Sequence, residues 1–310
     1  MRVVYLGSGD IGLPSLEWLL AAPEVQVVGV VTQPDRPSGR GLQVKPSAIK
    51  ETALRHGLVP LQPAKIRAAE ALAQVAALEP DLFVVMAYGQ ILPQQVLDVP
   101  RLGAINLHAS LLPRHRGAAP VHAAVLAGDS ASGITVMWMD AGLDTGDILL
   151  SKECELRSDE TAGSLHDRLA EIAPVALAEA VRLIGNDAAP RVPQEESKAT
   201  YAPKLDRSHG RLAWQGSAAE LDRRIRGLHP RPGSTAVADL ENGKRVVLKV
   251  HRAAVRKGSA PAGQLISGLR VGCAGGGLLE LCEVQPAGGK KMSGEDFLRG
   301  YRPRRMLDAV

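Results

Sequence analysis

The first 31 residues, MRVVYLGSGDIGLPSLEWLLAAPEVQVVGVV, decide the fold. An apolar run at residues 3–6 enters a glycine turn, helical spacing follows over residues 14–21, and a second apolar run covers residues 25–31. The same pattern continues with apolar runs at 82–87, 104–107 and 134–139 and helical spacing at 46–56 and 68–78. Strands that alternate with helices in this way form a mostly parallel sheet with helices on both faces. The sequence therefore predicts an α/β fold for the first part of the chain.

The second part of the chain has a different pattern of predicted elements. Residues 160–184 predict one long helix, and the stretch that follows contains three prolines and no periodicity. Beyond it, a possible helix at 218–228 precedes five short strand-like segments, at 234–240, 245–251, 263–266, 269–273 and 278–284. Five short strands with a helix indicate a small barrel, a common binder of nucleic acids or sugars. We expect a catalytic domain at residues 1–188, a linker at 189–205 and a barrel domain at 206–310.

Composition excludes several classes of protein. The chain has 310 residues, 45% of them hydrophobic and 23% charged, which is typical of a folded globular protein and not of a disordered one. The three cysteines, Cys154, Cys273 and Cys282, form no disulfide framework and no zinc-binding pair. The N-terminus lacks the pattern of a signal peptide, and no stretch of 18 apolar residues occurs. We expect a cytoplasmic protein with no membrane segment and no metal.

The charges are unevenly distributed along the chain. Residues 1–205 hold 18 Lys and Arg against 23 Asp and Glu, whereas residues 206–310 hold 19 against 10. A basic second part is the expected footprint of a polyanion partner such as a nucleic acid. A solvated basic face remains the alternative at this point.

A glycine motif near the N-terminus points to a different function. Gly7, Gly9 and Gly12 have the spacing of a dinucleotide-binding turn, and Asp35 lies where a ribose-binding acid would be expected. This motif alone would suggest a nicotinamide-dependent oxidoreductase. Pro34 and Pro37 flank Asp35, however, and indicate an exposed loop instead of a strand tip. We do not expect NAD(P) to bind.

The segment at residues 103–147 contains the candidate chemistry. Asn106 and His108 alternate with apolar neighbours, which in a strand directs both side chains to one face. Ligands bind at the carboxyl ends of strands in open α/β sheets. Asp144 lies in a turn-rich loop after the next predicted strand, so that the two loops could meet in one cleft.

Plainer interpretations of these residues stay open. His108, His115 and His122 are seven residues apart, but Pro113 and Pro120 exclude a continuous helix through them, so we expect no metal site. His108 could be a structural histidine. The three acidic side chains of the second loop could simply close turns, namely Asp140, Asp144 and Asp147.

Several strings taken together resemble one family. They are NLHASLLPRHRGAAP at 106–120, GLDTGD at 142–147, TQPDRPSGRG at 32–41, YAPKL at 201–205 and QPAGGKKMS at 285–293. These strings are similar to those of the folate-dependent formyltransferases, and the resemblance covers essentially the whole chain. It implies a Rossmann-like first domain that binds 10-formyltetrahydrofolate and an OB-like barrel that contacts tRNA. It also implies formyl transfer to the α-amino group of methionyl initiator tRNA, in protein biosynthesis. We expect the protein to be a monomer.

The resemblance also implies roles for individual residues. The catalytic positions are Asn106, His108 and Asp144. The folate-site loop is Ser110, Leu111, Leu112 and Pro113. Because folate rings need an apolar wall, we also expect folate contacts from Met86, Tyr88, Ile91, Leu92, Val136 and Met139, with Asp140 beside them, and a plain core role for most of these residues is the alternative. The loop with Arg36, Arg40 and Lys45 would enter the acceptor end of the tRNA, with solvated loop charges as the alternative. In the second domain we expect phosphate contacts from the basic residues Arg223, Arg224, Arg226, Lys244, Arg245, Lys249, Lys290 and Lys291.

The sequence departs from the family at three places. The first turn reads Gly-Ser-Gly-Asp-Ile at residues 7–11 where the family usually has Gly-Thr-Pro-x-Phe, and His115 and Arg231 replace aromatic residues. We therefore carry over no stacking contact to His115 or Arg231.

The expected mechanism needs no nucleophilic side chain. An α-amino group with a pKa near 8 is substantially neutral at pH 7 and can attack the formyl carbon directly. Asn106 and His108 would donate hydrogen bonds to the resulting oxyanion, and Asp144 would orient His108. A transferase with a small-molecule acceptor, a folate-site hydrolase and a pure RNA-binding module are the other candidates.

Overall fold

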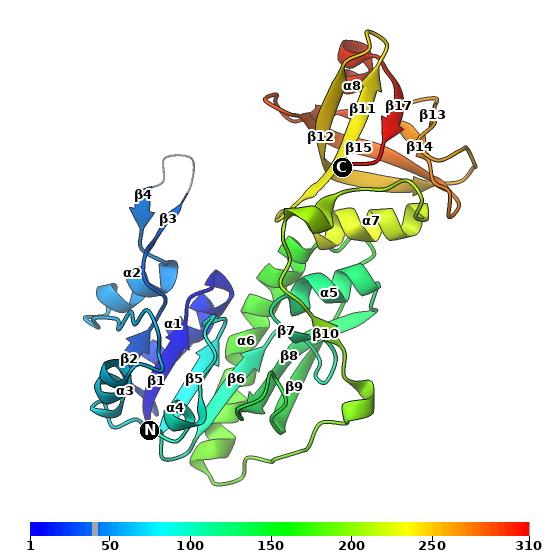
Figure 1. The fold of residues 1–310 in the computed structure, drawn as a ribbon. Coiled ribbons are helices and arrows are strands. Elements are labelled where there is room, and N and C mark those ends of the chain that lie inside the picture. Colours follow the sequence, from blue (N-terminus) through cyan, green and yellow to red (C-terminus); the bar gives the residue numbers. More distant parts are fainter. Residues whose placement is uncertain (39–42, 310) are drawn as a thin grey trace. The chain divides into compact units, whose positions relative to one another are not determined.

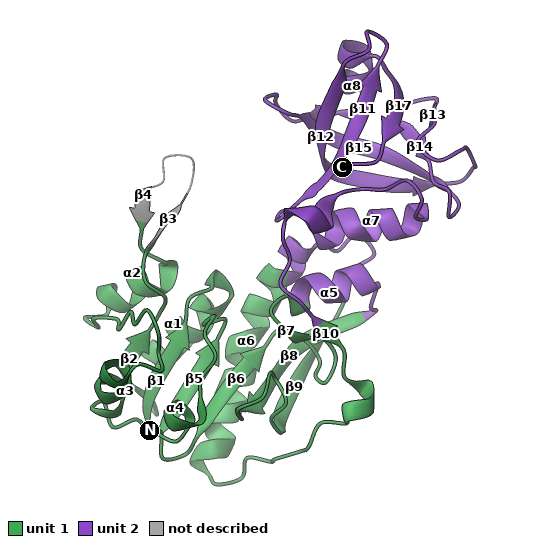
Figure 2. Cartoon of the chain, viewed as in Figure 1, with its two compact units in different colours: residues 1–120, 131–155, 166–201 green, residues 121–130, 156–165, 202–310 purple. Residues whose placement is uncertain are grey.

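The computed structural model describes residues 1–38 and 43–309. They form two compact units (Figure 2), which we call the first and the second unit. The first unit comprises residues 1–120, 131–155 and 166–201, and the second unit comprises residues 121–130, 156–165 and 202–310. The expected linker is therefore divided, since contacts assign its residues up to Tyr201 to the first unit.

The first unit contains a six-stranded sheet in the order β2-β1-β5-β6-β8-β9 (Figure 1). The strands are β1 (Arg2–Gly7), β2 (Gln26–Val31), β5 (Leu82–Met86), β6 (Ala104–His108), β8 (Ala131–Trp138) and β9 (Ile148–Glu155). The first four run parallel, as predicted, and β8 and β9 are antiparallel to their neighbours. β9 was not predicted because its exposed face carries Lys and Glu, as befits an edge strand.

Helices surround this sheet in the chain order that the pattern predicts. They are α1 (Leu13–Ala21), α2 (Ala48–Arg55), α3 (Ala69–Ala76), the short α4 (Gln94–Leu97) and most of α6 (Ala162–Gly185), whereas nearly all of α5 (Pro120–Ala127) belongs to the second unit. The central strands β5 and β6 are buried along their whole length. A strand covered on both faces requires a continuous apolar run, which explains why Leu82–Met86 was recognisable from sequence.

The glycine turn after β1 is explained by packing. A Cβ at Gly12 would lie 2.1 Å from the hydroxyl of Tyr5, and that hydroxyl donates a hydrogen bond to the carbonyl of Gly12. The backbone N–H groups of Ser8 and Gly9 both donate to the carbonyl of Ala87 at 3.2 Å. These contacts account for the glycine spacing without a dinucleotide, because the donors that would cradle a pyrophosphate are already engaged. Asp35 accepts hydrogen bonds from Lys50 and Gln62, which hold the pKa of its carboxyl below the usual value.

Two short sheets complete this part of the chain. β3 (Arg36–Ser38) pairs with β4 (Gln43–Lys45), and β7 (Arg116–Gly117) pairs with β10 (Tyr201–Ala202). Arg40, one of the predicted tRNA contacts, lies outside the described residues.

The second unit contains the predicted small barrel. Its strands run in the order β13-β14-β15-β12-β11-β17, with β16 paired to β15, and a bridge between Gln264 and Arg305 brings the two ends of the order together. They are β11 (Ser234–Leu240), β12 (Arg245–Arg256), β13 (Leu265–Ile266), β14 (Arg270–Gly272), β15 (Leu278–Pro286), β16 (Met292–Ser293) and β17 (Pro303–Leu307). Five were predicted; β16 is only two residues long, and β17 begins with a proline and two arginines.

Two helices accompany the barrel, α7 (Ala218–Gly227) and α8 (Gly294–Tyr301), of which only α7 was predicted. Ser217 and Glu220 form a capping box at the start of α7, and Ser293 caps α8. Trp214 and Phe297 are fully buried in the core between the helices and the strands. Within the described ranges, no helix has both the length and the apolar character needed to cross a membrane.

Candidate active site

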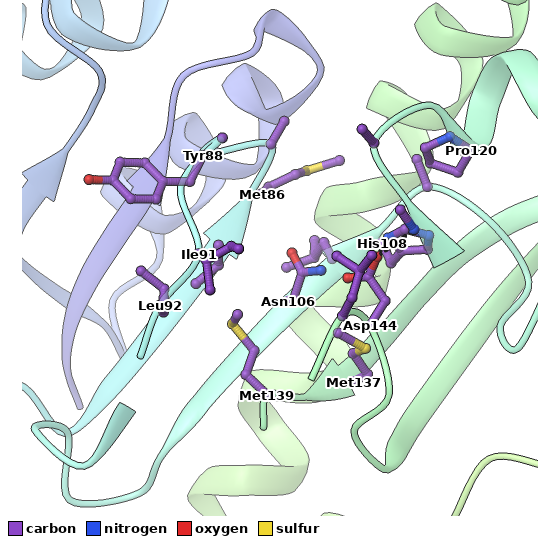
Figure 3. Close-up of a pocket in the computed structure, with 18 of the residues that line it drawn as sticks. Met86, Tyr88, Ile91, Leu92, Asn106, His108, Pro120, Met137, Met139 and Asp144 are labelled. Carbon is purple, nitrogen blue, oxygen red and sulfur yellow. Dashed lines mark hydrogen bonds and ion pairs between the residues drawn. The ribbon is translucent and has the colours of Figure 1, made fainter. Parts of the chain in front are cut away.

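A cavity of about 500 Å³ opens in the first unit at the carboxyl ends of β5 and β6 (Figure 3). Its lining comes from β5 and the loop after it, from β6, from the segment at 117–120, and from the end of β8 with the loop at 139–144. Open α/β sheets bind their ligands at this end of the strands.

Asn106 and His108 both line this cavity, as the alternation in β6 predicts. Asn106 is 9% exposed and His108 is 5% exposed, so both polar side chains are largely removed from bulk water. His108 has two polar neighbours within the fold. Asn106, in contrast, has no side-chain hydrogen bond to any residue that the structure describes. Its amide is therefore available to a bound molecule.

His108 is fixed through both ring nitrogens. Nε2 lies 3.0 Å from the carbonyl oxygen of His115, and because a carbonyl only accepts, Nε2 carries the proton of the neutral ring. Nδ1 lies 3.6 Å from Oδ2 of Asp144. That oxygen also accepts a hydrogen bond of 2.7 Å from the backbone N–H of Gly117. The arrangement leaves Nδ1 as the ring position that can gain a proton, with a carboxylate beside it.

The loop that carries Asp144 is held by a residue that sequence analysis missed. The side-chain amide nitrogen of Gln194 donates to the carbonyls of Asp144 (2.9 Å) and Gly146 (2.8 Å). Its oxygen accepts from the guanidinium of Arg116, which is almost fully buried and also pairs with Glu196. Gln194 lies in the stretch predicted as a linker, where the lack of periodicity gave no signal of a role.

The same stretch is attached to the first unit at further points. Val192 and Ile148 exchange two backbone hydrogen bonds, and the carbonyl of Pro190 accepts from the indole of Trp138. The guanidinium of Arg191 lies 4.0 Å from the centre of the Trp138 ring. We call residues 190–200 the strap, because they are attached by hydrogen bonds to β8, β9 and the loop that carries Asp144.

Most of the predicted folate wall lies around the cavity. Met86, Tyr88, Ile91, Leu92, Met139 and Asp140 all line it. Val136 does not; Met137 lines the cavity in its place, because residues 137 and 139 share one face of the strand. Ile91 is 81% exposed and Leu143 is 56% exposed, so the mouth is apolar.

The predicted loop at residues 110–113 lies elsewhere. Ser110, Leu111, Leu112 and Pro113 are not among the residues that line the cavity. The hydroxyl of Thr135 donates to the carbonyl of Ser110 and accepts from the N–H of Leu112, which ties this loop to β8.

Besides His108 and Asp144, the titratable side chains that line the cavity are Asp140, which accepts from the hydroxyl of Thr145, and Tyr88. Burial raises the pKa of Tyr88 to about 12, and its hydroxyl has no hydrogen-bond partner in the described part of the molecule. Across residues 1–38 and 43–309, no group of three or more His, Cys, Asp or Glu side chains is placed to hold a metal ion.

The predicted tRNA contacts occupy varied environments. Lys45, Arg224, Lys244, Arg245 and Lys290 are exposed. Arg226 pairs with Asp222 at 2.8 Å, and Lys291 lies 3.7 Å from Glu283. Arg223 is half-buried, and a Cβ at Gly128 would lie 2.8 Å from its Cδ. For Arg36, only the backbone in β3 is described.

The first unit thus has an apolar cavity with three polar side chains at its base, Asn106, His108 and Asp144, and comparisons with known proteins give its class. The chain belongs to the formyl transferase family, since residues 1–181 match the family model for formyl transferase and residues 204–302 match the model for its C-terminal domain.

The curated relatives are more specific. The chain is 47% identical to a methionyl-tRNA formyltransferase of Pseudomonas paraeruginosa, over 97% of this chain and 96% of that protein. It is 46% identical to the methionyl-tRNA formyltransferase of Pseudomonas fluorescens, over 100% and 97%. Among solved structures, it shares the fold of WlaRD, a sugar 3N-formyl transferase crystallised with dTDP and 5-N-formyl-THF. The TM-score is 0.66 and the identity 14%, over 92% of this chain and 97% of that chain.

Proposed function

We propose that this enzyme transfers the formyl group of 10-formyltetrahydrofolate to the α-amino group of methionyl initiator tRNA. The observation that carries the proposal is the cavity itself. It places the unpartnered amide of Asn106 beside the His108–Asp144 pair, in the first unit of a chain that belongs to the formyl transferases. Full-length similarity to methionyl-tRNA formyltransferases supports the acceptor.

The lining of the cavity fits a folate. Met86, Leu92 and Met139 provide an apolar wall for a flat heterocycle, and Ile91 and Leu143 extend it to the mouth. Pockets for such ligands are mostly apolar with a few placed polar groups, which is the balance found here. When bound, the folate supplies an activated formyl carbon and a nitrogen leaving group.

Asn106 would act on the oxygen of that carbon. The acceptor amine attacks, a new C–N bond forms, and negative charge develops on the formyl oxygen. A side-chain amide that donates to this oxygen stabilises the tetrahedral intermediate, which is worth about 2.7–4 kcal/mol per donor. Because Asn106 gives up no protein hydrogen bond to do so, its donor is ready before the reaction begins.

His108 and Asp144 would move the proton. The attacking amine loses a proton as the C–N bond forms, and Nδ1 of His108 is the position that can take it. Asp144 stabilises the resulting imidazolium. His108 then returns the proton to the folate nitrogen, so that the old C–N bond breaks and a neutral amine leaves. The geometry thus favours His108 as the proton carrier more than as a second oxyanion donor.

The deciding experiment measures formyl transfer from 10-formyltetrahydrofolate to charged initiator tRNA. Charged elongator tRNA and free methionine serve as alternative acceptors. We expect transfer to the initiator alone. Folate binding without transfer to any tRNA would contradict the acceptor and favour a small amine, as in the sugar formyl transferases that share the fold.

The remaining predictions about partners follow from this activity. A charged tRNA as acceptor supports a place of action in the cytoplasm, and we propose that the enzyme acts as a monomer. Light scattering of the purified protein, with and without tRNA, tests the oligomeric state. The exposed Lys45 and the positions Arg36 and Arg40 stay predicted contacts to the acceptor end.

A further inference from the structure

A turn in the second unit is fixed by several hydrogen bonds. It comprises residues 229–233, His-Pro-Arg-Pro-Gly, directly after α7. The carbonyl of His229 accepts from the N–H of Gly163, and the N–H of Gly233 donates to the carbonyl of Leu228. On its other side, Nε2 of His122 lies 3.1 Å from the carbonyl of Arg231. The His229 side chain is therefore presented from a fixed backbone.

A second histidine faces the first. The rings of His229 and His251 are 6.1 Å apart and nearly perpendicular. His251 lies in β12 at a bulge, between Val250 and Arg252, where the register against β15 shifts. Bulges redirect a side chain and recur next to binding sites. The local backbone thus brings the two imidazoles together from separate elements.

The proton positions of His251 can be assigned from its neighbour. The amide nitrogen of Gln285 donates to the carbonyl of Gly289 at 3.0 Å, which fixes the orientation of that amide. The amide oxygen must then accept from Nε2 of His251, 3.1 Å away. Nε2 therefore carries a proton in both charge states, and Nδ1 is the atom that titrates.

Positive charges surround this histidine pair. The ammonium of Lys249 lies against the turn, 3.2 Å from where a Cβ of Gly233 would be. Lys291, which is half-exposed, approaches from the residue before β16. Glu283 is the one carboxylate among the described groups whose charges act on the pair, and it already lies 3.7 Å from Lys291. Burial, together with His251, Lys291 and Lys249, lowers the pKa of His229, and burial, Lys291 and Lys249 lower that of His251.

We propose that His229 and His251, with Lys249 and Lys291, bind a phosphate of the tRNA backbone and take up a proton when they do. The inference rests on the proposed function, since it takes tRNA as the partner. Burial and the two nearby ammonium groups disfavour the charged form of both imidazoles in the free protein, whereas the negative charge of a bound phosphate favours it. An imidazolium then donates a charge-assisted hydrogen bond to the phosphate oxygen.

The sign of the pH dependence follows from this linkage. A bound phosphate raises the pKa of the histidine that contacts it, so that binding is strongest when the histidine is protonated. The gain is fully present below the free-state pKa and is lost as pH rises through the bound-state pKa. We expect the affinity for initiator tRNA to increase at least about threefold between pH 8 and pH 6 at constant ionic strength.

Calorimetry on the full-length protein tests the proposal directly. Binding of initiator tRNA is measured near pH 6.5 in two buffers of different ionisation enthalpy, which gives the number of protons taken up. The wild type is expected to take up a measurable fraction of a proton. The double variant His229→Asn, His251→Gln should lose this uptake and the pH dependence, because Gln at 251 keeps the donor toward Gln285 but cannot titrate. Thermal melts of each variant confirm folding.

A matched control separates this site from titration elsewhere. His209→Asn removes an exposed histidine of the same unit that pairs with Asp206, and should leave the uptake unchanged. Equal uptake in the wild type and the double variant would overturn the proposal, although formyl transfer to tRNA would stand. Equal uptake with inorganic phosphate alone would assign the site to a free anion instead. Failure of the wild type to bind initiator tRNA would refute the proposed function itself.

Discussion

Asn106 and His108 differ in how firmly the fold holds them. Both ring nitrogens of His108 face protein oxygens, at 3.0 Å and 3.6 Å, whereas the amide of Asn106 has no hydrogen-bond partner in the described chain. The Asn106 side chain lines the cavity, so its amide keeps its hydrogen-bonding capacity for a bound molecule.

The loss of this amide gives the first prediction. Asn106→Ala should lower kcat by about 100- to 1000-fold and leave the KM for the formyl donor almost unchanged, because the hydrogen bond forms only in the transition state. Steady-state kinetics with both substrates measure the split. An effect confined to KM would show that Asn106 contributes to substrate binding alone.

His108 and Asp144 should behave as one unit. Asp144→Asn and His108→Ala are each expected to lower kcat at least about 100-fold, and the double variant should be little worse than the more damaging single variant. Non-additivity is expected because Asp144 acts through the imidazole. His166→Ala, at a half-exposed histidine of the same unit that pairs with Asp10, is the control and should keep near-normal turnover. Fully additive losses would contradict the coupling.

The apolar mouth of the cavity provides a test of folate binding. Ile91→Ser should raise the KM for the formyl donor about tenfold, since covering one Ile side chain is worth about 1.5–3 kcal/mol. Val59, also 81% exposed but absent from the cavity lining, provides a matched control in Val59→Ser. Similar KM changes in both variants would argue against the mouth as a folate contact.

At the scale of elements, the strands that are buried on both faces were the ones that could be predicted from the sequence. The run that forms β5 is apolar throughout, and β1 is apolar from Val3 to Leu6. In β6, Asn106 and His108 alternate with apolar residues, and this alternation indicated the functional face of the strand. β9 and β17 mix charged and apolar residues at sheet edges, and their pattern resembles that of a loop. The strap was missed for a related reason, since its contacts are made by backbone and by single polar side chains.

Gln194 allows a test of the strap. Gln194→Ala removes both hydrogen bonds that hold the Asp144 loop. Since small misplacements of catalytic groups cost up to about 100-fold, we expect kcat to fall between about tenfold and 100-fold while the protein stays folded. Gln94→Ala, at an exposed position in α4 that pairs with Asp98, is the control. Unchanged turnover in Gln194→Ala would mean that the loop keeps its position without the strap.

At the scale of the whole molecule, the two parts of the sequence differ in net charge, which is negative for residues 1–205 and positive for residues 206–310. The excess of basic residues beyond residue 205 was evident from counting, and it predicts binding of tRNA with a steep salt dependence. Counting could not tell which cations are already paired, as Arg226 is with Asp222. The structure leaves Lys290 and Lys244 exposed, so they are better candidates for phosphate contacts.

The salt dependence can be measured residue by residue. The logarithm of the tRNA association constant should fall linearly with the logarithm of salt concentration, and Lys290→Gln should reduce the slope by about one unit if Lys290 contacts a phosphate. The KM for the formyl donor should change far less with salt. Glu295→Gln, an exposed acidic position in α8, serves as the charge-change control. A slope unchanged by Lys290→Gln would remove this lysine from the interface.

The strap has a consequence for dissecting the chain into working parts. A cut at the prolines near residue 190, where the sequence looks dispensable, would yield a truncated enzyme that keeps the whole sheet yet lacks Gln194. Such a fragment should fold and turn over poorly, and extending it to Tyr201 should recover the geometry of the Asp144 loop. A chimera that replaces the basic barrel with another RNA-binding module should accordingly be joined after residue 201. In this chain, the residues that lead to the second unit also hold the catalytic loop of the first unit in place.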